Sequence, residues 1–200
     1  MKHKIVVYSD YIWPFCYIGK GIVDQLKKEF DIEDEWMPLE IHPETPKEGK
    51  LISKVFPASN IEKMFANLRN VGKLYDIDFI GNDLLSNSHL ALAAGEYAKE
   101  KGKFEEFHEK VFHTYFNAGK DIGDIKVLSN IAEGLGLNQE EMVKELEDRT
   151  YDNVLNNTQA IAHQHDIGSA PTFIIDDKYA IVGAQSVEAF KEALLNIEKQ

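Results

Sequence analysis

Hydrophobic residues follow two periods along the first part of the chain, and their order predicts a strand, a helix and a second strand. The continuous apolar run 5–8 predicts a buried strand. A helix is expected over residues 14–30, because proline suits a first helical position and apolar residues recur there at four-residue spacing. Alternation over 35–41 predicts the second strand, and Pro38 within it is typical of a sheet edge or a bulge.

The middle of the chain carries only helical patterns. Residues 42–59 are rich in proline, lysine and glutamate, which indicates a long surface connection. A strong helical pattern follows over 61–75. Further helices are expected, with Asp124 and Asn138 as N-caps of two of them, over residues 90–101, 104–116, 125–134, from 139 through the 150s, and in a last stretch ending at 165–166.

The end of the chain returns to strands. Residues 171–175 and 179–182 predict a hairpin that turns at 176–178, and Ser186 should cap a terminal helix over 187–197. This order predicts an α/β protein with a large all-helical insertion. We expect a discontinuous domain made of residues 1–58 and 158–200, and a helical insertion domain over 59–157.

Charge excludes some classes of partner. Lysine and arginine number 22 against 34 aspartates and glutamates, which gives a net charge of −12. Nucleic acid and anionic membranes are therefore not expected to bind. No apolar run approaches the roughly 20 residues of a membrane span or forms a secretory signal core, so a cytoplasmic protein is expected.

Cysteine chemistry is limited to one residue, Cys16. A single thiol cannot form a disulfide within the chain. If Trp13 caps the first helix, Cys16 is the third helical residue, where the partial positive end of the helix would lower its pKa. The alternative is a buried, inert cysteine that serves only as a small apolar side chain.

The histidines do not predict a metal site. His108 and His113 are five residues apart and do not share a helix face well, and His163 and His165 lack nearby carboxylate or cysteine partners in the sequence. No bound metal is expected.

Two stretches, with the helical block between them, resemble a known family. Residues 13–20 and 168–173 are similar to the DsbA-like branch of the thioredoxin-fold superfamily, and most like its cytoplasmic FrnE-type members. The resemblance implies a thioredoxin-like fold with a large helical insertion. Further similar stretches are 87–92, 102–108, 119–124 and 183–186.

The resemblance also implies an active site, from which this chain departs. In the family a Cys-x-x-Cys motif starts the helix and its first cysteine is the nucleophile. Here Trp13 holds that position, followed by Pro14, Phe15 and the remaining Cys16. One thiol can form a mixed disulfide but cannot resolve it, so an external thiol such as glutathione would be needed.

A second site element is implied by the match at Ala170 and Pro171. In the family the corresponding peptide bond is cis, and its loop lies against the active-site helix and presents backbone groups to an extended substrate or to glutathione. Gln185 and Ser186, at the start of the last helix, would then be partners for glutathione carboxylates. No permanently bound cofactor is expected, and glutathione would be a co-substrate.

Three functions remain open from the sequence. The first is thiol-disulfide oxidoreductase chemistry on protein or small-molecule substrates, with Cys16 as the only possible redox thiol. The second is glutathione-dependent isomerase or transferase chemistry, as in the related 2-hydroxychromene-2-carboxylate isomerases and kappa-class glutathione transferases. The third is binding of peptides or small molecules without turnover, with Trp13 covering the former site. A monomer or a homodimer is expected in each case.

Overall fold

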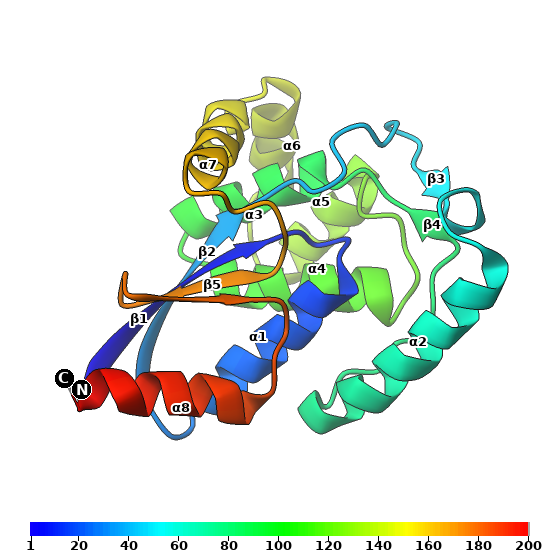
Figure 1. The fold of residues 1–200 in the computed structure, drawn as a ribbon. Coiled ribbons are helices and arrows are strands. Elements are labelled where there is room, and N and C mark those ends of the chain that lie inside the picture. The colour runs from blue at the N-terminus through cyan, green and yellow to red at the C-terminus, as the bar shows by residue number, and fades with distance from the viewer. Residues whose placement is uncertain (200) are drawn as a thin grey trace.

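A four-stranded sheet forms the centre of the molecule (Figure 1). The computed structural model describes residues 1–199, apart from the side chains of residues 58 and 59. The strands lie in the order β2-β1-β5-β6. β1 runs parallel to β2 and antiparallel to β5, which pairs antiparallel with β6. Their bounds are Lys2–Ser9 for β1, Asp31–Pro38 for β2, Thr172–Ile175 for β5 and Tyr179–Val182 for β6.

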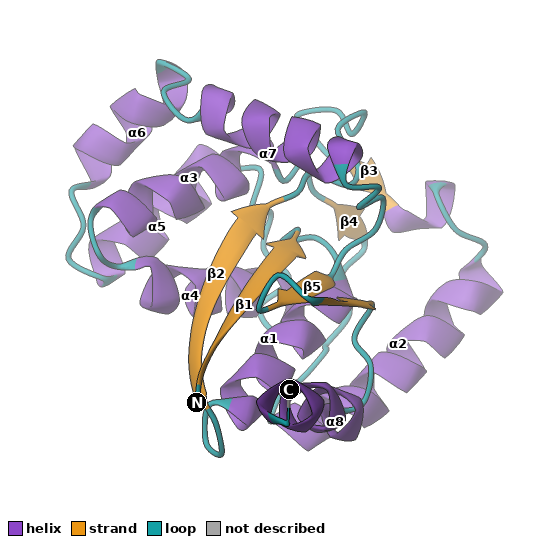
Figure 2. Cartoon of the chain, turned by 60° about the vertical axis from the view of Figure 1, so that its left-hand side comes forward, coloured by secondary structure: helices purple, strands orange, loops and turns teal. Residues whose placement is uncertain are grey.

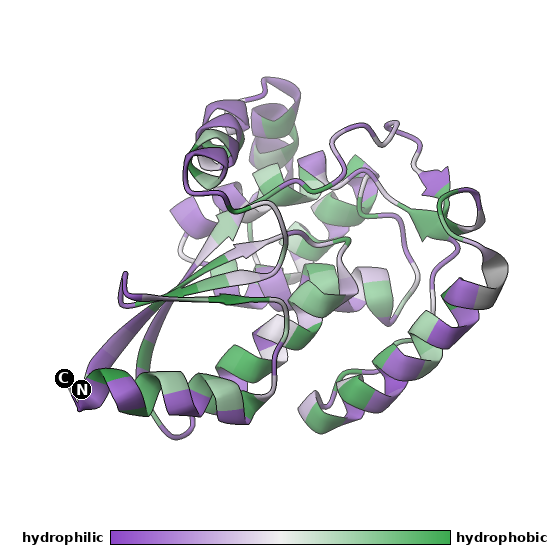
Figure 3. Ribbon diagram, viewed as in Figure 1, coloured by the Kyte–Doolittle hydropathy of each residue, from purple (hydrophilic) through white to green (hydrophobic). Residues whose placement is uncertain are grey.

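Helices α1 (Pro14–Leu26) and α8 (Val187–Glu198) cover one face of this sheet (Figures 1 and 2). Val7 and Phe173 are opposite each other in β1 and β5, and both side chains are fully buried. The ring of Phe173 lies 4.8 Å, centre to centre, from that of Phe190 in α8. The paired segments 5–8 of β1 and 172–175 of β5 are mainly apolar, whereas residues 2–4 at the start of β1 are hydrophilic (Figure 3).

A block of helices separates β2 from β5 along the chain, as the hydrophobic pattern predicts (Figure 1). A separate two-stranded antiparallel sheet is formed by β3 (Lys50–Leu51) and β4 (Leu84–Leu85), with the first of these helices between its strands along the chain. The helices are α2 (Ala58–Gly72), α3 (His89–Glu100), α4 (Phe104–Phe116), α5 (Ile125–Gly134), α6 (Gln139–Glu147) and α7 (Asp152–Gln164). None of the helices within the described residues is long and apolar enough to cross a membrane.

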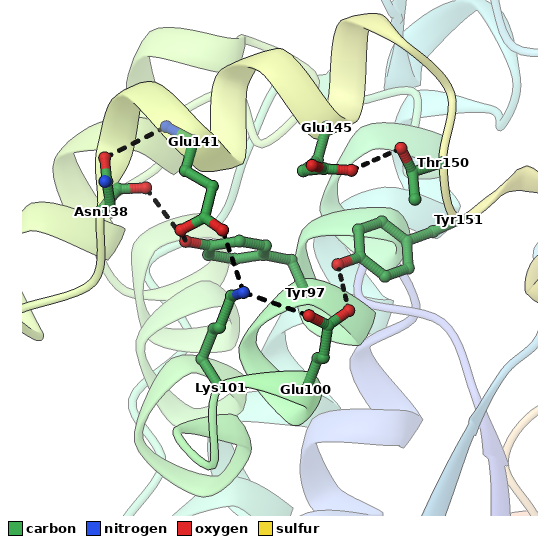
Figure 4. Close-up of polar contacts among 8 residues, drawn as sticks. All are labelled: Tyr97, Glu100, Lys101, Asn138, Glu141, Glu145, Thr150 and Tyr151. Carbon is green, nitrogen blue, oxygen red and sulfur yellow. Dashed lines mark hydrogen bonds and ion pairs between the residues drawn. The ribbon is translucent and has the colours of Figure 1, made fainter.

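Polar contacts tie α6 and the start of α7 to α3 (Figure 4). The Tyr97 hydroxyl donates to Glu141 Oε2 at 3.1 Å. Lys101 Nζ lies between Glu141 and Glu100, at 3.0 and 3.1 Å from their carboxylate oxygens. The Tyr151 hydroxyl donates to Glu100 Oε2 at 2.9 Å. The helical block is thus held by its own hydrogen bonds as well as by its apolar core.

Two predicted elements near the beginning have wrong bounds. The first helix ends at Leu26 rather than Phe30. The second strand covers 31–38 rather than 35–41. Residues 27–30 form the turn between them, where the backbone N–H groups of Lys27 and Phe30 still donate to carbonyls of the last helical turn.

Two further predictions need correction in the helical block. The helix expected from residue 139 through the 150s is two helices, α6 and α7, because Arg149 adopts a left-handed backbone with φ of 57°. The connection 42–59 is not wholly irregular, since it contains β3 and a short 3-10 turn at Ile52–Lys54. The pattern over 61–75 is α2, which starts earlier, followed by a 3-10 turn at Lys73–Tyr75.

Candidate functional site

The start of α1 has the predicted geometry. Trp13 is the N-cap with an extended backbone, Pro14 is the first helical residue and Cys16 the third. The Trp13 side chain makes no capping hydrogen bond. Because Pro14 has no N–H, the backbone N–H of Phe15 is the first donor at this positive end of the helix.

Cys16 does not have the environment expected of a reactive thiol. Its side chain is 0% exposed, and its Sγ accepts a hydrogen bond from the backbone N–H of Asp10 at 3.4 Å. Burial raises the pKa of the Cys16 thiol to about 12, and this outweighs the lowering by the Asp10 N–H. The predicted lowering of this pKa by the helix end is therefore wrong. In the folded protein the thiol is protonated and inaccessible.

Asp10, whose backbone N–H contacts Cys16, has a fully buried side chain. Its two oxygens accept hydrogen bonds from the backbone N–H of Ile12 at 3.2 Å and of Ile41 at 2.9 Å. Burial nevertheless raises the pKa of Asp10 to about 6. The Asp10 carboxyl thus joins the residues before α1 to the segment that follows β2. The sequence did not predict this role.

Trp13 occupies the position at which the resemblance implies the family's first cysteine. Its ring is half-buried and lies 6.0 Å, centre to centre, from Phe15 and 6.5 Å from His42. Trp13, Pro14 and His42 line a pocket of only about 30 Å³. Since a space of this size holds about one water molecule, a ligand must lie on the surface of this site rather than under Trp13.

The Ala170–Pro171 bond is cis, as the resemblance implies, and its loop lies against α1. A Cβ added at Gly19 would be 3.4 Å from Pro171 Cγ, which shows how closely the two segments approach. Among the residues that the structure describes, neither the N–H nor the C=O of Ala170 has a hydrogen-bond partner. This residue can therefore pair with an extended ligand as a strand would.

Gln185 and Ser186 lie close to the same loop. The N–H of Gly183 donates to the carbonyl of Pro171 at 2.8 Å, which holds the segment before α8 next to the cis-proline. Ser186 Oγ accepts from the Ala189 N–H at 3.3 Å and caps α8, as predicted. Gln185 Nε2 donates to the carbonyl of Val182 at 3.0 Å. Contact with glutathione stays a prediction for both residues.

The structure adds two residues that the sequence gave no reason to assign to this site, Asp10 and His42. Asp10 directly follows the first strand, three residues before Trp13, and this position beside the helix start is the one signal that could have drawn attention to it. His42 is 29 residues away along the chain and carries no such signal. Within residues 1–199, no group of three His, Cys, Asp or Glu side chains is placed to hold a metal ion.

This fold, with a cis-proline loop against the helix that follows β1, defines a thioredoxin-like protein. The chain belongs to the DSBA-like thioredoxin domain family, which it matches over residues 4–195. The fold class that the resemblance implies, a thioredoxin-like α/β fold with a helical insertion, is thereby confirmed.

The chain is also similar to individual proteins and solved structures. The chain is 32% identical over 208 residues to the uncharacterized protein YwbO of Bacillus subtilis, with 100% of both chains covered. It is 23% identical over 184 residues to 2-hydroxychromene-2-carboxylate isomerase of Sphingobium xenophagum, covering 89% of this chain and 91% of that protein. The crystal structure of the "probable DsbA oxidoreductase SCO1869" of Streptomyces coelicolor superposes with a TM-score of 0.91 at 22% identity, covering 99% of this chain and 91% of that one.

Proposed function

We propose that this protein binds glutathione, or a cysteine-containing peptide, at the edge formed by the start of α1 and the cis-proline loop, and that the bound thiol carries the chemistry in place of Cys16. The observation that carries the proposal is the contrast within the site. Cys16 is fully buried with its pKa raised to about 12, whereas the backbone of Ala170 remains unpaired. The likeness to an isomerase at 23% identity is compatible with a family member that has left dithiol chemistry.

The binding mode follows from the unpaired groups. The ligand backbone pairs with the N–H and C=O of Ala170, and a ligand thiolate lies near the Phe15 N–H, where the positive end of α1 stabilises the anion. The start of α8, which Ser186 caps, offers a second positive helix end to a ligand carboxylate. Such a ligand keeps its free thiol only in a reducing compartment. We therefore propose that the protein acts in the cytoplasm, like the FrnE-type proteins that its sequence resembles.

Calorimetric titration with millimolar glutathione tests this binding. The natural protein and Cys16→Ser should bind glutathione in the same saturable manner, because the Cys16 thiol does not face the ligand. Absence of binding to both proteins would overturn the proposal. Glutathione disulfide serves as a matched probe that lacks the free thiol and should bind more weakly.

A turnover assay then distinguishes a protein that uses glutathione in a reaction from one that only binds it. Reduction of a generic protein disulfide in the presence of glutathione is compared for the natural protein and Trp13→Cys. Trp13→Cys should gain rapid dithiol turnover, since it restores a Cys-x-x-Cys sequence at the N-cap of α1. Turnover by the natural protein that Cys16→Ser abolishes would show that Cys16 is a working thiol and would contradict the proposal.

Binding of an extended peptide without turnover is the second candidate. It is favoured by the same unpaired backbone at Ala170, which requires no thiol from the ligand. Saturable binding of a cysteine-free peptide at least as strong as that of glutathione would favour this candidate over the first.

A further inference from the structure

A cavity of about 730 Å³ lies where the starts of α3, α5 and α7 meet the segment that follows β2. None of the residues that line it belongs to the Trp13 and Pro171 site. Its wall includes Glu40 after β2, His89 at the first position of α3 and Asp152 at the first position of α7. The His89 side chain contacts both carboxylates, and this cluster raises a separate question of function.

His89 lies between the two carboxylates. Its Nδ1 is 3.2 Å from Glu40 Oε2 and its Nε2 is 3.0 Å from Asp152 Oδ1. Ionised carboxylates only accept hydrogen bonds, so both ring nitrogens must donate, which is possible only for the protonated imidazole. The 29% exposure of the His89 side chain leaves it open to exchange of that proton with water.

Other charges face His89 from every element around the cavity. Arg149 forms an ion pair with Asp152, and the Asp124 carboxylate caps α5 by accepting from the Lys126 N–H at 2.9 Å. The remaining charged groups of the wall are Lys47, Glu145 and Glu147. With five carboxylates against Lys47 and Arg149, the wall is acidic, and loss of the His89 charge would increase its self-repulsion.

The balance of these effects favours the charged form of His89. The hydrogen bond to Glu40 raises the pKa of His89 above its usual value, partial burial opposes this, and the hydrogen bond to Asp152 adds to the rise. These contacts therefore favour the imidazolium, and they weaken as the pH rises through the raised pKa of His89.

The contacts of His89 connect segments that matter elsewhere in the molecule. Glu40 precedes Ile41, whose N–H donates to the buried Asp10 carboxylate at 2.9 Å. His42, next along the chain, contacts Trp13. Asp152 opens α7, the helix that leads into the cis-proline loop. Both segments that His89 holds thus continue directly to the first site.

We propose that Glu40, His89 and Asp152 form a proton-dependent clasp that holds the segment after β2 against the start of α7 and releases it when His89 becomes neutral. A neutral imidazole has one N–H, so its other nitrogen would direct a lone pair at a carboxylate. One of the two contacts then breaks and the cavity widens. The clasp does not depend on glutathione binding at the first site.

Hydrogen exchange measured by mass spectrometry on the full chain tests the clasp. Exchange rates of residues 39–47 and 150–156 are compared at pH 6.0 and 8.5 after correction for the intrinsic effect of pH. In the natural protein we expect exchange several-fold faster at pH 8.5 than at pH 6.0, because a neutral imidazole can donate to only one of the two carboxylates. His89→Gln should exchange fast at both pH values, whereas the control His163→Gln, an exposed position on α7, should follow the natural protein.

Equal corrected rates at the two pH values in the natural protein would overturn the proposal, as would loss of the pH dependence in His163→Gln. If His89→Gln does not fold, nitrogen NMR of the natural protein decides. Two protonated ring nitrogens on His89 at pH 6.0 are expected, and a neutral ring at that pH would contradict the clasp. His3 also lies between two carboxylates, Asp176 and Glu198, but these contacts are at the β5–β6 turn and the end of α8 and not in these segments.

Discussion

Cys16 and His89 both occupy the first turn of a helix and both have an acidic residue as hydrogen-bond partner, Asp10 through its backbone N–H and Glu40 through its carboxylate, yet their protonation is governed by different effects. The positive end of α1 should favour a Cys16 thiolate, but complete burial keeps the thiol neutral. The positive end of α3 should disfavour a His89 imidazolium, but hydrogen bonds to two carboxylates raise the pKa of His89. Desolvation and direct partners, rather than the helix dipole, decide the charge at both positions.

The largest effect expected from this comparison is on thiol reactivity. With a pKa of about 12, Cys16 has a thiolate fraction about 10³-fold smaller at pH 8 than an ordinary thiol. Reaction with an aromatic disulfide reagent should therefore be slower by about that factor in the folded protein than in guanidinium. Trp13→Cys provides the positive control, because its new thiol lies at the half-buried N-cap. Native reaction within tenfold of the denatured rate would refute the account of a dry, inert cysteine.

Asp10 should make stability depend on pH in the acidic range. Its pKa is raised from 3.8 to about 6 on folding, so its contribution is present below pH of about 4 and is lost as the pH rises through 6. The loss is of the order of 3 kcal/mol in the free energy of unfolding. Urea titrations from pH 4 to 7.5 should show this fall in the natural protein and a flatter profile for Asp10→Asn. Asp83→Asn, an exposed position, should retain the fall.

His89 should produce a smaller effect on the alkaline side. Its pKa is raised on folding, so its stabilising contribution is complete below 6.5 and is lost as the pH rises through the folded-state pKa. Because the side chain is partly exposed, we expect His89→Gln to cost about 1 kcal/mol at pH 6 and less at higher pH. The same urea titrations measure it, and an equal cost at pH 6 and pH 9 would show that the contact is structural and not proton-dependent.

The smallest expected effect separates the clasp from its neighbour at the start of α7. Tyr151→Phe removes the hydrogen bond to Glu100, an exposed carboxylate, and should cost about 0.5 kcal/mol at every pH between 6 and 9. Urea unfolding at two pH values checks this. A cost that changes with pH would mean that the start of α7 titrates through groups other than His89.

Much of the fold could be predicted because the capping residues and the spacing of hydrophobic residues indicate the same helices and strands. Asp124, Asn138 and Ser186 all accept the backbone hydrogen bonds expected of N-caps. The second strand was predicted to start too late, at residue 35 instead of 31, because β2 lies at the sheet edge, where acidic residues are tolerated. There Lys2 lies 2.7 Å from Glu33 and Lys4 2.8 Å from Glu35, so charges from the neighbouring strand compensate them.

The break between α6 and α7 could not be predicted, because Arg149 takes the left-handed backbone that a glycine usually signals. The two-residue strands β3 and β4 are too short for a period to appear. They are also separated along the chain by residues 52–83, and no local pattern specifies a contact across such a separation.

The resemblance predicted which two segments lie together, but not the state of the Cys16 thiol. The resemblance located Trp13 and Pro171, and the structure places both segments at the same end of α1. The state of the Cys16 thiol depends on how much protein surrounds it, which a helix-end argument does not include. The Glu40, His89 and Asp152 contacts join residues 49 and 63 positions apart, so only the tertiary fold could reveal them.

The two ends of the chain lie side by side (Figure 1). The N-terminal ammonium group is 3.5 Å from a carboxylate oxygen of Glu198, and His3 hydrogen bonds to the same side chain. A short glycine-rich linker could therefore join the ends, and new ends could be opened at the exposed Gly102 between α3 and α4. Such a circular permutant would keep the sheet and both sites intact while reversing the order in which a ribosome delivers the two halves of the sheet.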